Sequence, residues 1–168
     1  MTDPKTLTLS LPGAMLRRGF WLYVWRIDTP KGEYLYVGRT GDSSSPHANP
    51  PFTRMSQHLG RKKKSNALKR NLLTKAGIDA EDCDLFDLFM HGPIFDEVPQ
   101  IGTRDERMEK HKPLRDMVAA MEKQLQLDLT EAGYNVLNVV NSRKELDLVL
   151  WKKVRSAFEE HFEKLKHS

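Results

Sequence analysis

Cysteine is almost absent from this chain of 168 residues, which contains only Cys83. A single thiol excludes a disulfide bond within the chain, and it excludes zinc sites that are built from paired cysteines. Because disulfides are rare in reducing compartments, this composition predicts a cytoplasmic protein.

Long apolar runs are also lacking. No stretch of about 18 apolar residues occurs in the sequence, which therefore predicts no transmembrane helix and no membrane partner. The N-terminal residues 1–12 contain Pro4, Pro12 and three threonines, and they lack the uninterrupted apolar core of a signal peptide. We therefore expect a soluble protein that is not exported.

Acidic residues are missing from one part of the chain and basic residues from the next. Residues 52–75 contain eight Lys or Arg and no acid, whereas residues 76–100 contain seven acids and no Lys or Arg. The net charge of the whole chain, +4, is small by comparison. This segregation predicts a protein with one basic face.

Two runs of aromatic and β-branched residues, 22–27 and 34–37, flank a connection that contains a proline and a glycine. This pattern predicts a β-hairpin. Side chains alternate between the two faces of a strand, so Tyr23 and Trp25 share one face, and Tyr36 shares a face of the partner strand with the tyrosine two residues before it.

The remaining elements are predicted by apolar spacing and by capping residues. An apolar run predicts a third strand over residues 84–90, and residues 94–103 are expected to form a loop. Helices are predicted over residues 52–59, 66–75 and 104–129 and from residue 142 onward. Pro113 predicts a kink or break in the third helix, and Ser142 with Glu145 has the pattern of a capping box that opens the last one.

A chain of this length is sufficient for one domain. We expect an α+β fold in which helices flank a small three-stranded antiparallel sheet. Residues 1–20 are expected to form an N-terminal arm or an edge strand, residues 21–141 the domain itself, and residues 142–168 an extra C-terminal helix packed on the same domain.

Three polar residues are placed by the predicted helices in positions suited to a site. Arg54 and His58 are four residues apart, so they point the same way from their helix. Glu122 lies beside an apolar stripe that includes Val118 and Leu125, so its carboxylate should emerge at the rim of the core.

Taken in chain order, these motifs resemble those of the GIY-YIG nuclease family over residues 22–138. The matching elements are Tyr23-Val24-Trp25, Tyr36-Val37-Gly38 followed by Arg39, Arg54 with His58, Glu122, and Gly133-Tyr134-Asn135-Val136-Leu137.

The resemblance implies an endonuclease that hydrolyses DNA phosphodiester bonds with Mg²⁺ or Mn²⁺ held at Glu122. The catalytic residues that it implies are Tyr23, Tyr36, Arg54, His58, Glu122 and Asn135. Arg54 offers a planar fork for phosphate oxygens, and His58 can orient a tyrosine hydroxyl or relay its proton. Positive charge from Arg54, Arg39 and the cation is expected to lower the pKa of a tyrosine that acts as general base.

Several assignments have rivals within the sequence. Asn138 competes with Asn135, and Glu109 and Glu106 compete with Glu122 as the metal ligand. The other histidines lack metal-ligand spacing, so we interpret them as structural or exposed; they are His47, His91, His111, His161 and His167.

Trp25 departs from the family pattern, because it stands where the family has a tyrosine often proposed as general base. Indole has only an N–H donor and cannot accept a proton from water. Either Tyr36 or Tyr23 takes over this role, or a metal-activated water attacks without a tyrosine, or the chain is a degenerate relative that binds DNA or RNA without cleaving it.

The basic segment is expected to bind the phosphate backbone of DNA, and RNA remains an open alternative. The expected contacts are Arg39, Arg61, Lys62, Lys63, Lys64, Lys69 and Arg70. The sequence shows no zinc finger or helix-turn-helix, so recognition is expected to depend on DNA shape, ends or branches, or on a protein partner. A protein-interaction domain with a merely solubilising basic face is the remaining rival.

Overall fold

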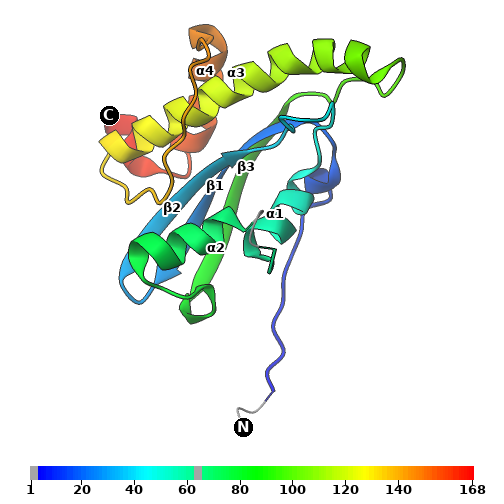
Figure 1. The fold of residues 1–168 in the computed structure, drawn as a ribbon. Coiled ribbons are helices and arrows are strands. Elements are labelled where there is room, and N and C mark those ends of the chain that lie inside the picture. The colour runs from blue at the N-terminus through cyan, green and yellow to red at the C-terminus, as the bar shows by residue number, and fades with distance from the viewer. Residues whose placement is uncertain (1–3, 63–65) are drawn as a thin grey trace.

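The computed structural model describes residues 4–62 and 66–168, which form an α+β fold around a three-stranded antiparallel sheet (Figure 1). The strands are β1 (Phe20–Thr29), β2 (Gly32–Arg39) and β3 (Leu85–Phe95), and their order in the sheet is β2-β1-β3. The predicted fold class and hairpin are therefore confirmed, and each strand is longer than the run that predicted it.

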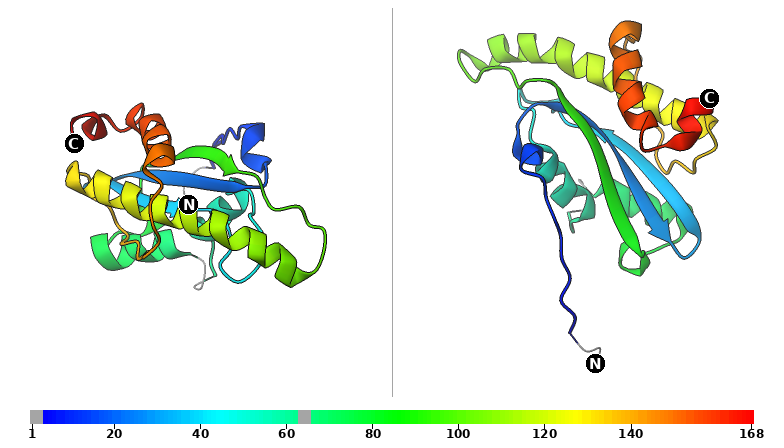
Figure 2. Two further views of the ribbon diagram at one scale, coloured as in Figure 1. Left: turned by 90° about the horizontal axis from the view of Figure 1, so that it is seen from above. Right: turned by 180° about the vertical axis from the view of Figure 1, so that it is seen from behind.

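Helices cover both faces of the sheet (Figures 1 and 2). One face carries α1 (Pro51–Leu59) and α2 (Ala67–Asn71), the latter continued by the π-helical turn η2 (Leu72–Ala76). The other face carries α3 (Arg104–Glu131), α4 (Leu148–Glu159) and the short 3-10 helix η4 (Glu163–His167). The predicted helices over residues 52–59, 66–75 and 104–129 are thus confirmed.

The central strand β1 is buried on both faces, because its side chains alternate between two hydrophobic clusters. Leu22 and Val24 belong to the cluster beneath α3 and α4. Tyr23, Trp25 and Ile27 belong to the cluster beneath α1 and α2. The aromatic face predicted for the hairpin is therefore covered by helices over most of its length.

Strand β3 continues five residues past its predicted end, across the Gly92-Pro93 pair to Phe95. Proline lacks the N–H that a central strand must donate, but β3 is an edge strand, where this loss is tolerated. The register with β1 shifts between Phe20 and Leu22, which accommodates the irregular backbone. The prediction of a loop from residue 94 is wrong by these few residues.

Helix α3 runs without interruption through Pro113, so the predicted break is wrong. Pro113 is exposed, and so is Glu109, whose carbonyl it leaves without an N–H partner, so water can take the place of that partner. The helix begins with a capping box in which Thr103 and Glu106 exchange side-chain and backbone hydrogen bonds. Glu106 therefore has a structural role at the N-terminal end of α3.

The last helix begins later than predicted, and its cap is Asp147 instead of Ser142. The Asp147 carboxylate accepts hydrogen bonds from the backbone N–H groups of Val149 and Leu150, both at 3.0 Å. The Ser142 hydroxyl accepts one from the N–H of Lys144 at 3.3 Å, in the segment that precedes the helix. An N-cap needs donors of the first helical turn, which here lie beyond the reach of Ser142.

Residues 4–12 form neither helix nor strand, and Leu7 and Leu9 are exposed. Residues 9–12 line a hollow together with residues of the domain, and toward the N-terminus the chain extends away from it (Figure 1). Of the two alternatives for the N-terminus, the arm describes these residues. In the described part of the chain, no helix combines the length and the apolar character that crossing a membrane requires.

Replacing the cap tests where α4 begins. Asp147→Ala should lower the free energy of unfolding by about 1 kcal/mol, because two N–H donors lose their acceptor. Ser142→Ala is the matched control and should change it by less than about 0.5 kcal/mol. Urea unfolding of both variants measures the difference, and equal losses would contradict the assignment of the cap.

Candidate active site

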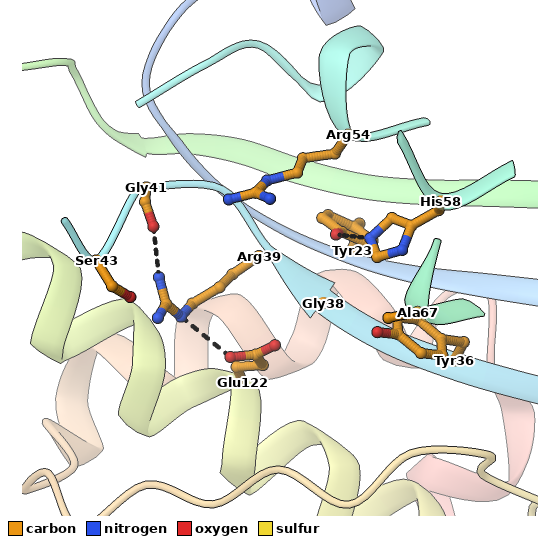
Figure 3. Close-up of a pocket in the computed structure, with 10 residues that line it drawn as sticks. All are labelled: Tyr23, Tyr36, Gly38, Arg39, Gly41, Ser43, Arg54, His58, Ala67 and Glu122. Carbon is orange, nitrogen blue, oxygen red and sulfur yellow. Dashed lines mark hydrogen bonds and ion pairs between the residues drawn. The ribbon is translucent and has the colours of Figure 1, made fainter. Parts of the chain in front are cut away.

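A hollow of about 310 Å³ lies at the Gly38–Arg39 end of strand β2 (Figure 3). Its walls come from the sheet, from α1 and α2 on one face and from α3 on the other. The residues that line it are Tyr23, Tyr36, Gly38, Arg39, Gly41, Ser43, Arg54, His58, Ala67 and Glu122. We call this hollow the catalytic pocket after the sequence predictions alone, because it brings together five of the six residues predicted to be catalytic.

Tyr23 forms the floor of the pocket and pairs across the hairpin with Gly38. A Cβ atom at Gly38 would lie 2.5 Å from the Tyr23 ring, so only glycine leaves room for the ring. The Tyr23 hydroxyl lies 2.7 Å from Nε2 of His58, a hydrogen bond that joins the sheet to α1. Two distant parts of the chain therefore meet at one polar contact.

Helix α1 supplies Arg54 and His58 on one side, as their spacing predicts. The Arg54 guanidinium donates to Oε1 of Gln57 at 3.1 Å and to Oδ1 of Asp42 at 3.3 Å. These bonds use two of its five N–H donors. The ring of Tyr36 meets His58 edge-on, with centroids 5.1 Å apart. Arg54 is thus held at the mouth of the pocket, and its guanidinium has N–H donors that these two bonds do not use.

Helix α3 supplies Glu122 from the opposite wall, where its Oε2 accepts from Nε of Arg39 at 3.0 Å. The same guanidinium donates to the carbonyl of Gly41 at 2.8 Å. Both side chains are 17% exposed. The second carboxylate oxygen of Glu122 points away from Arg39 (Figure 3), so the ion pair occupies one side of the carboxylate only.

Burial has the largest effect on the pKa values of the tyrosine and histidine residues that line the pocket. It raises the pKa of Tyr36 to about 12, and it raises the pKa of Tyr23 further above the ordinary tyrosine value. Burial, with a smaller contribution from Arg54, lowers the pKa of His58 to about 4. Arg54 lowers the pKa of both tyrosines and Arg39 lowers that of Tyr23, as expected, but desolvation outweighs the two guanidinium groups.

Glu122 follows the same rule, since burial raises the pKa of its carboxyl group although Arg39 and Arg54 act in the opposite direction. At neutral pH the site thus combines two tyrosines that keep their protons, a neutral imidazole and a carboxylate whose ionisation is costly. Such a set of buried titratable groups in a concavity is typical of a functional site.

The residues present suit one kind of metal ion. Within residues 4–62 and 66–168, no group of three or more His, Cys, Asp or Glu side chains is placed to hold a metal. Glu122 offers a single carboxylate in the pocket. Mg²⁺ binds through one or two carboxylates and takes its other ligands from water and substrate phosphate, so the pocket fits this ion better than zinc.

Asn135 is the predicted catalytic residue that does not reach the pocket. It is exposed, and its amide donates to the carbonyl of Glu33 at 3.4 Å. Its rival Asn138 instead makes two bonds with the backbone of Val37, accepting from the N–H at 2.9 Å and donating to the carbonyl at 2.8 Å. Asn138 therefore fixes strand β2 immediately before Gly38.

Trp25 also lies outside the catalytic pocket. It is 2% exposed, packs edge-on against Phe86, and its Nε1 is buried without a hydrogen-bond partner among the described residues. It lines a separate apolar hollow beneath the N-terminal arm. Of the two tyrosines expected to take over its role, Tyr23 and Tyr36, the one whose hydroxyl reaches His58 is Tyr23.

The predicted nucleic-acid contacts are spread around the pocket. Arg39 lies within it, whereas Arg61 and Lys62 are exposed beyond α1, and Arg70 is exposed on α2. Lys69 pairs with Glu81 at 3.0 Å. The predictions for Lys63 and Lys64 lie outside the described residues.

Sequence reasoning missed Asp42, which orients Arg54. Its carboxylate also accepts from the Ser45 hydroxyl at 2.8 Å, and its carbonyl lies 2.8 Å from Nε2 of His111. Asp42 belongs to an irregular segment without periodicity, so only its position three residues after Arg39 distinguishes it in the sequence.

Comparison of the chain with protein-family models, with curated proteins and with solved structures finds no match in any of the three.

The titration of His58 predicts a pH-dependent stability. Between pH 6.5 and about 4, the unfolded chain binds a proton at His58 that the folded protein does not, so stability falls as pH falls through this window. From pH 7 to pH 4.5 the contribution of His58 is roughly 2–3 kcal/mol.

Urea unfolding across this range should show a shallower pH dependence for His58→Gln than for the wild type. His167→Gln, at an exposed position, is the matched control and should retain the wild-type slope. A parallel pH dependence of His58→Gln and wild type would contradict the buried, neutral imidazole.

Proposed function

We propose that this protein is a divalent-metal-dependent endonuclease that hydrolyses DNA phosphodiester bonds. The observation that carries the proposal is the convergence of a tyrosine–histidine pair, a guanidinium and a carboxylate on one pocket. These groups correspond to what the reaction requires: a route for the proton of the attacking water, a ligand for phosphoryl oxygens and a site for a cation.

The Tyr23–His58 pair supplies the route for the proton. Tyr23 keeps its proton and His58 is neutral. In the proposed relay His58 carries its own proton on Nδ1, so the Tyr23 hydroxyl donates to Nε2 and leaves its oxygen lone pairs for a water molecule. The water passes its proton to Tyr23 while Tyr23 passes its own to His58. The water oxygen bonds to phosphorus, the bond to the leaving oxygen breaks, and the tyrosine never exists as a free phenolate.

Arg54 binds the phosphate that undergoes attack. Its guanidinium is held by Gln57 and Asp42 and is 30% exposed at the mouth of the pocket. A planar fork with unused donors suits two phosphoryl oxygens, and its charge stabilises the charge that develops on them. Asp42 acts through Arg54 as a positioning residue.

Glu122 is the residue that would hold Mg²⁺ or Mn²⁺, together with the substrate phosphate. Such a cation, when bound, neutralises charge on the phosphate and assists departure of the leaving oxygen. Arg39 orients the carboxylate through Oε2 and leaves the other oxygen directed away from the ion pair. We also propose the cytoplasmic location that the sequence predicts.

Glu122→Gln tests the proposal with little change in shape. Purified protein, supplied with Mg²⁺ or Mn²⁺, should nick or linearise plasmid DNA or cut branched DNA. The variant should cleave at least about 10²-fold more slowly, because it lacks the anionic ligand. Glu131→Gln, exposed at the C-terminal end of the same helix, is the matched control and should cleave like the wild type.

Thermal unfolding separates a catalytic loss from a folding defect. Burial raises the pKa of Glu122, so the ionised form costs stability at neutral pH, and Glu122→Gln should unfold at or above the wild-type temperature. Undiminished cleavage by this stable variant would refute Glu122 as metal ligand. If the wild type cleaves nothing yet binds DNA in a salt-sensitive way, the alternative holds: a degenerate GIY-YIG-like domain that binds nucleic acid.

A further inference from the structure

A second hollow, of about 320 Å³, adjoins the catalytic pocket on the α3 side. The two hollows share Arg39, Ser43 and Glu122, so they are neighbours along the Arg39–Glu122 ion pair. The outer rim is the segment of residues 140–144, which precedes α4. We call this second hollow the α3 trough. The residues that line it are Arg39, Ser43, Arg115, Asp116, Ala119, Glu122, Val140, Asn141, Ser142, Arg143 and Lys144.

Positive charge is in excess in the α3 trough, which contains four Arg or Lys side chains and two carboxylates. Asp116 is shared between two cations: its Oδ1 accepts from Arg115 at 2.7 Å, and its Oδ2 lies 2.8 Å from Nζ of Lys144. Arg143 is exposed at the rim. One carboxylate divided between two cations leaves charge that an anion can neutralise.

The trough is held in place by contacts that exist without a ligand. Arg115 donates to the carbonyl of Ser43 at 3.1 Å, which ties it to the segment after β2. Lys123 donates to the carbonyl of Ser142 at 2.9 Å, and Gln126 accepts from the N–H of Val140 at 3.3 Å. These bonds fix residues 140–142 against α3. A site whose walls are already ordered loses little entropy when it binds.

The geometry points to a second phosphate site. We infer that the α3 trough binds a backbone phosphate of the same nucleic-acid strand whose neighbouring phosphate occupies the catalytic pocket. The inference rests on the proposed function. Arg115 lies at the base of the trough, and Arg143 and Lys144 contact the phosphate from its rim. An anion here needs no base-specific contact, so the site reads backbone and not sequence.

This site gives the substrate a direction across the protein. Helices α1 and α2, which precede or carry the basic residues of the segment 61–70, lie on one face of the sheet, whereas α3, which lines the trough, lies on the other (Figure 1). The strand crosses the Gly38–Arg39 end of β2, with the reacting phosphate at the crossing. Contacts with the phosphates on both sides of the reacting phosphate then hold it in position for attack by water.

Removing positive charge from the rim tests the proposed phosphate site by DNA binding, without any need for cleavage. The double variant Arg143→Ala/Lys144→Ala changes exposed side chains, so we expect it to fold. Lys152→Ala/Lys153→Ala, two exposed lysines of α4 that line neither hollow, removes the same charge and is the matched control. Fluorescence anisotropy with a short labelled DNA duplex in EDTA measures affinity without cleavage.

The rim variant should bind about tenfold more weakly at low salt. The slope of log K against log salt should be shallower by about 0.9, because the trough holds one phosphate and each lost phosphate contact removes about 0.9. The control should keep the wild-type slope. Equal slopes for the rim variant, the control and the wild type would overturn the inference that the trough binds phosphate. The absence of DNA binding by the wild type would overturn it as well.

The two proposals fail separately. If the rim variant shows a shallower salt dependence of log K but the wild type cleaves no substrate, the result supports phosphate binding in the α3 trough and refutes the endonuclease function. Metal-dependent cleavage that is abolished by Glu122→Gln, with an unchanged slope for the rim variant, supports the function and overturns the trough.

Discussion

The contact between the Tyr23 ring and Gly38 is the constraint on which the site depends. A Cβ atom at Gly38 would lie 2.5 Å from that ring, so the hairpin closes over Tyr23 only with glycine opposite. With the ring in this place its hydroxyl reaches His58 on α1, 2.7 Å away. The same end of β2 then presents Arg39 to Glu122 on α3. One close approach thus aligns groups from both helical layers.

Much of the fold follows from local patterns in the sequence. Aromatic and β-branched runs on either side of a turn predicted the hairpin, helix-start residues predicted α1, and apolar residues at helical spacing predicted α3. The errors lie where tertiary context overrides a local signal. Pro93 is tolerated because β3 is an edge strand, Pro113 because water can take the place of its missing N–H, and the cap of α4 is Asp147 because no helical donor lies within reach of Ser142.

The candidate site was predictable only in part. The spacing of Arg54 and His58 is a local property, and α1 preserves it. Asn138 acts 101 residues away from Val37, and Asp42 lies in an irregular segment, so no periodicity indicates their partners. The direction of the tyrosine pKa shifts was also inaccessible, because desolvation depends on how deeply the helices cover the sheet. The proposed mechanism accordingly uses a neutral tyrosine and imidazole instead of a phenolate.

The most direct test of this mechanism is the single-turnover rate of DNA cleavage by Tyr23→Phe, which removes one oxygen atom and retains the ring that packs on Gly38. The proton relay predicts a fall of about 10²–10⁴-fold. Tyr34→Phe, on strand β2 but outside the catalytic pocket, should cleave at the wild-type rate. A Tyr23→Phe variant that cleaves as fast as the wild type would contradict the account.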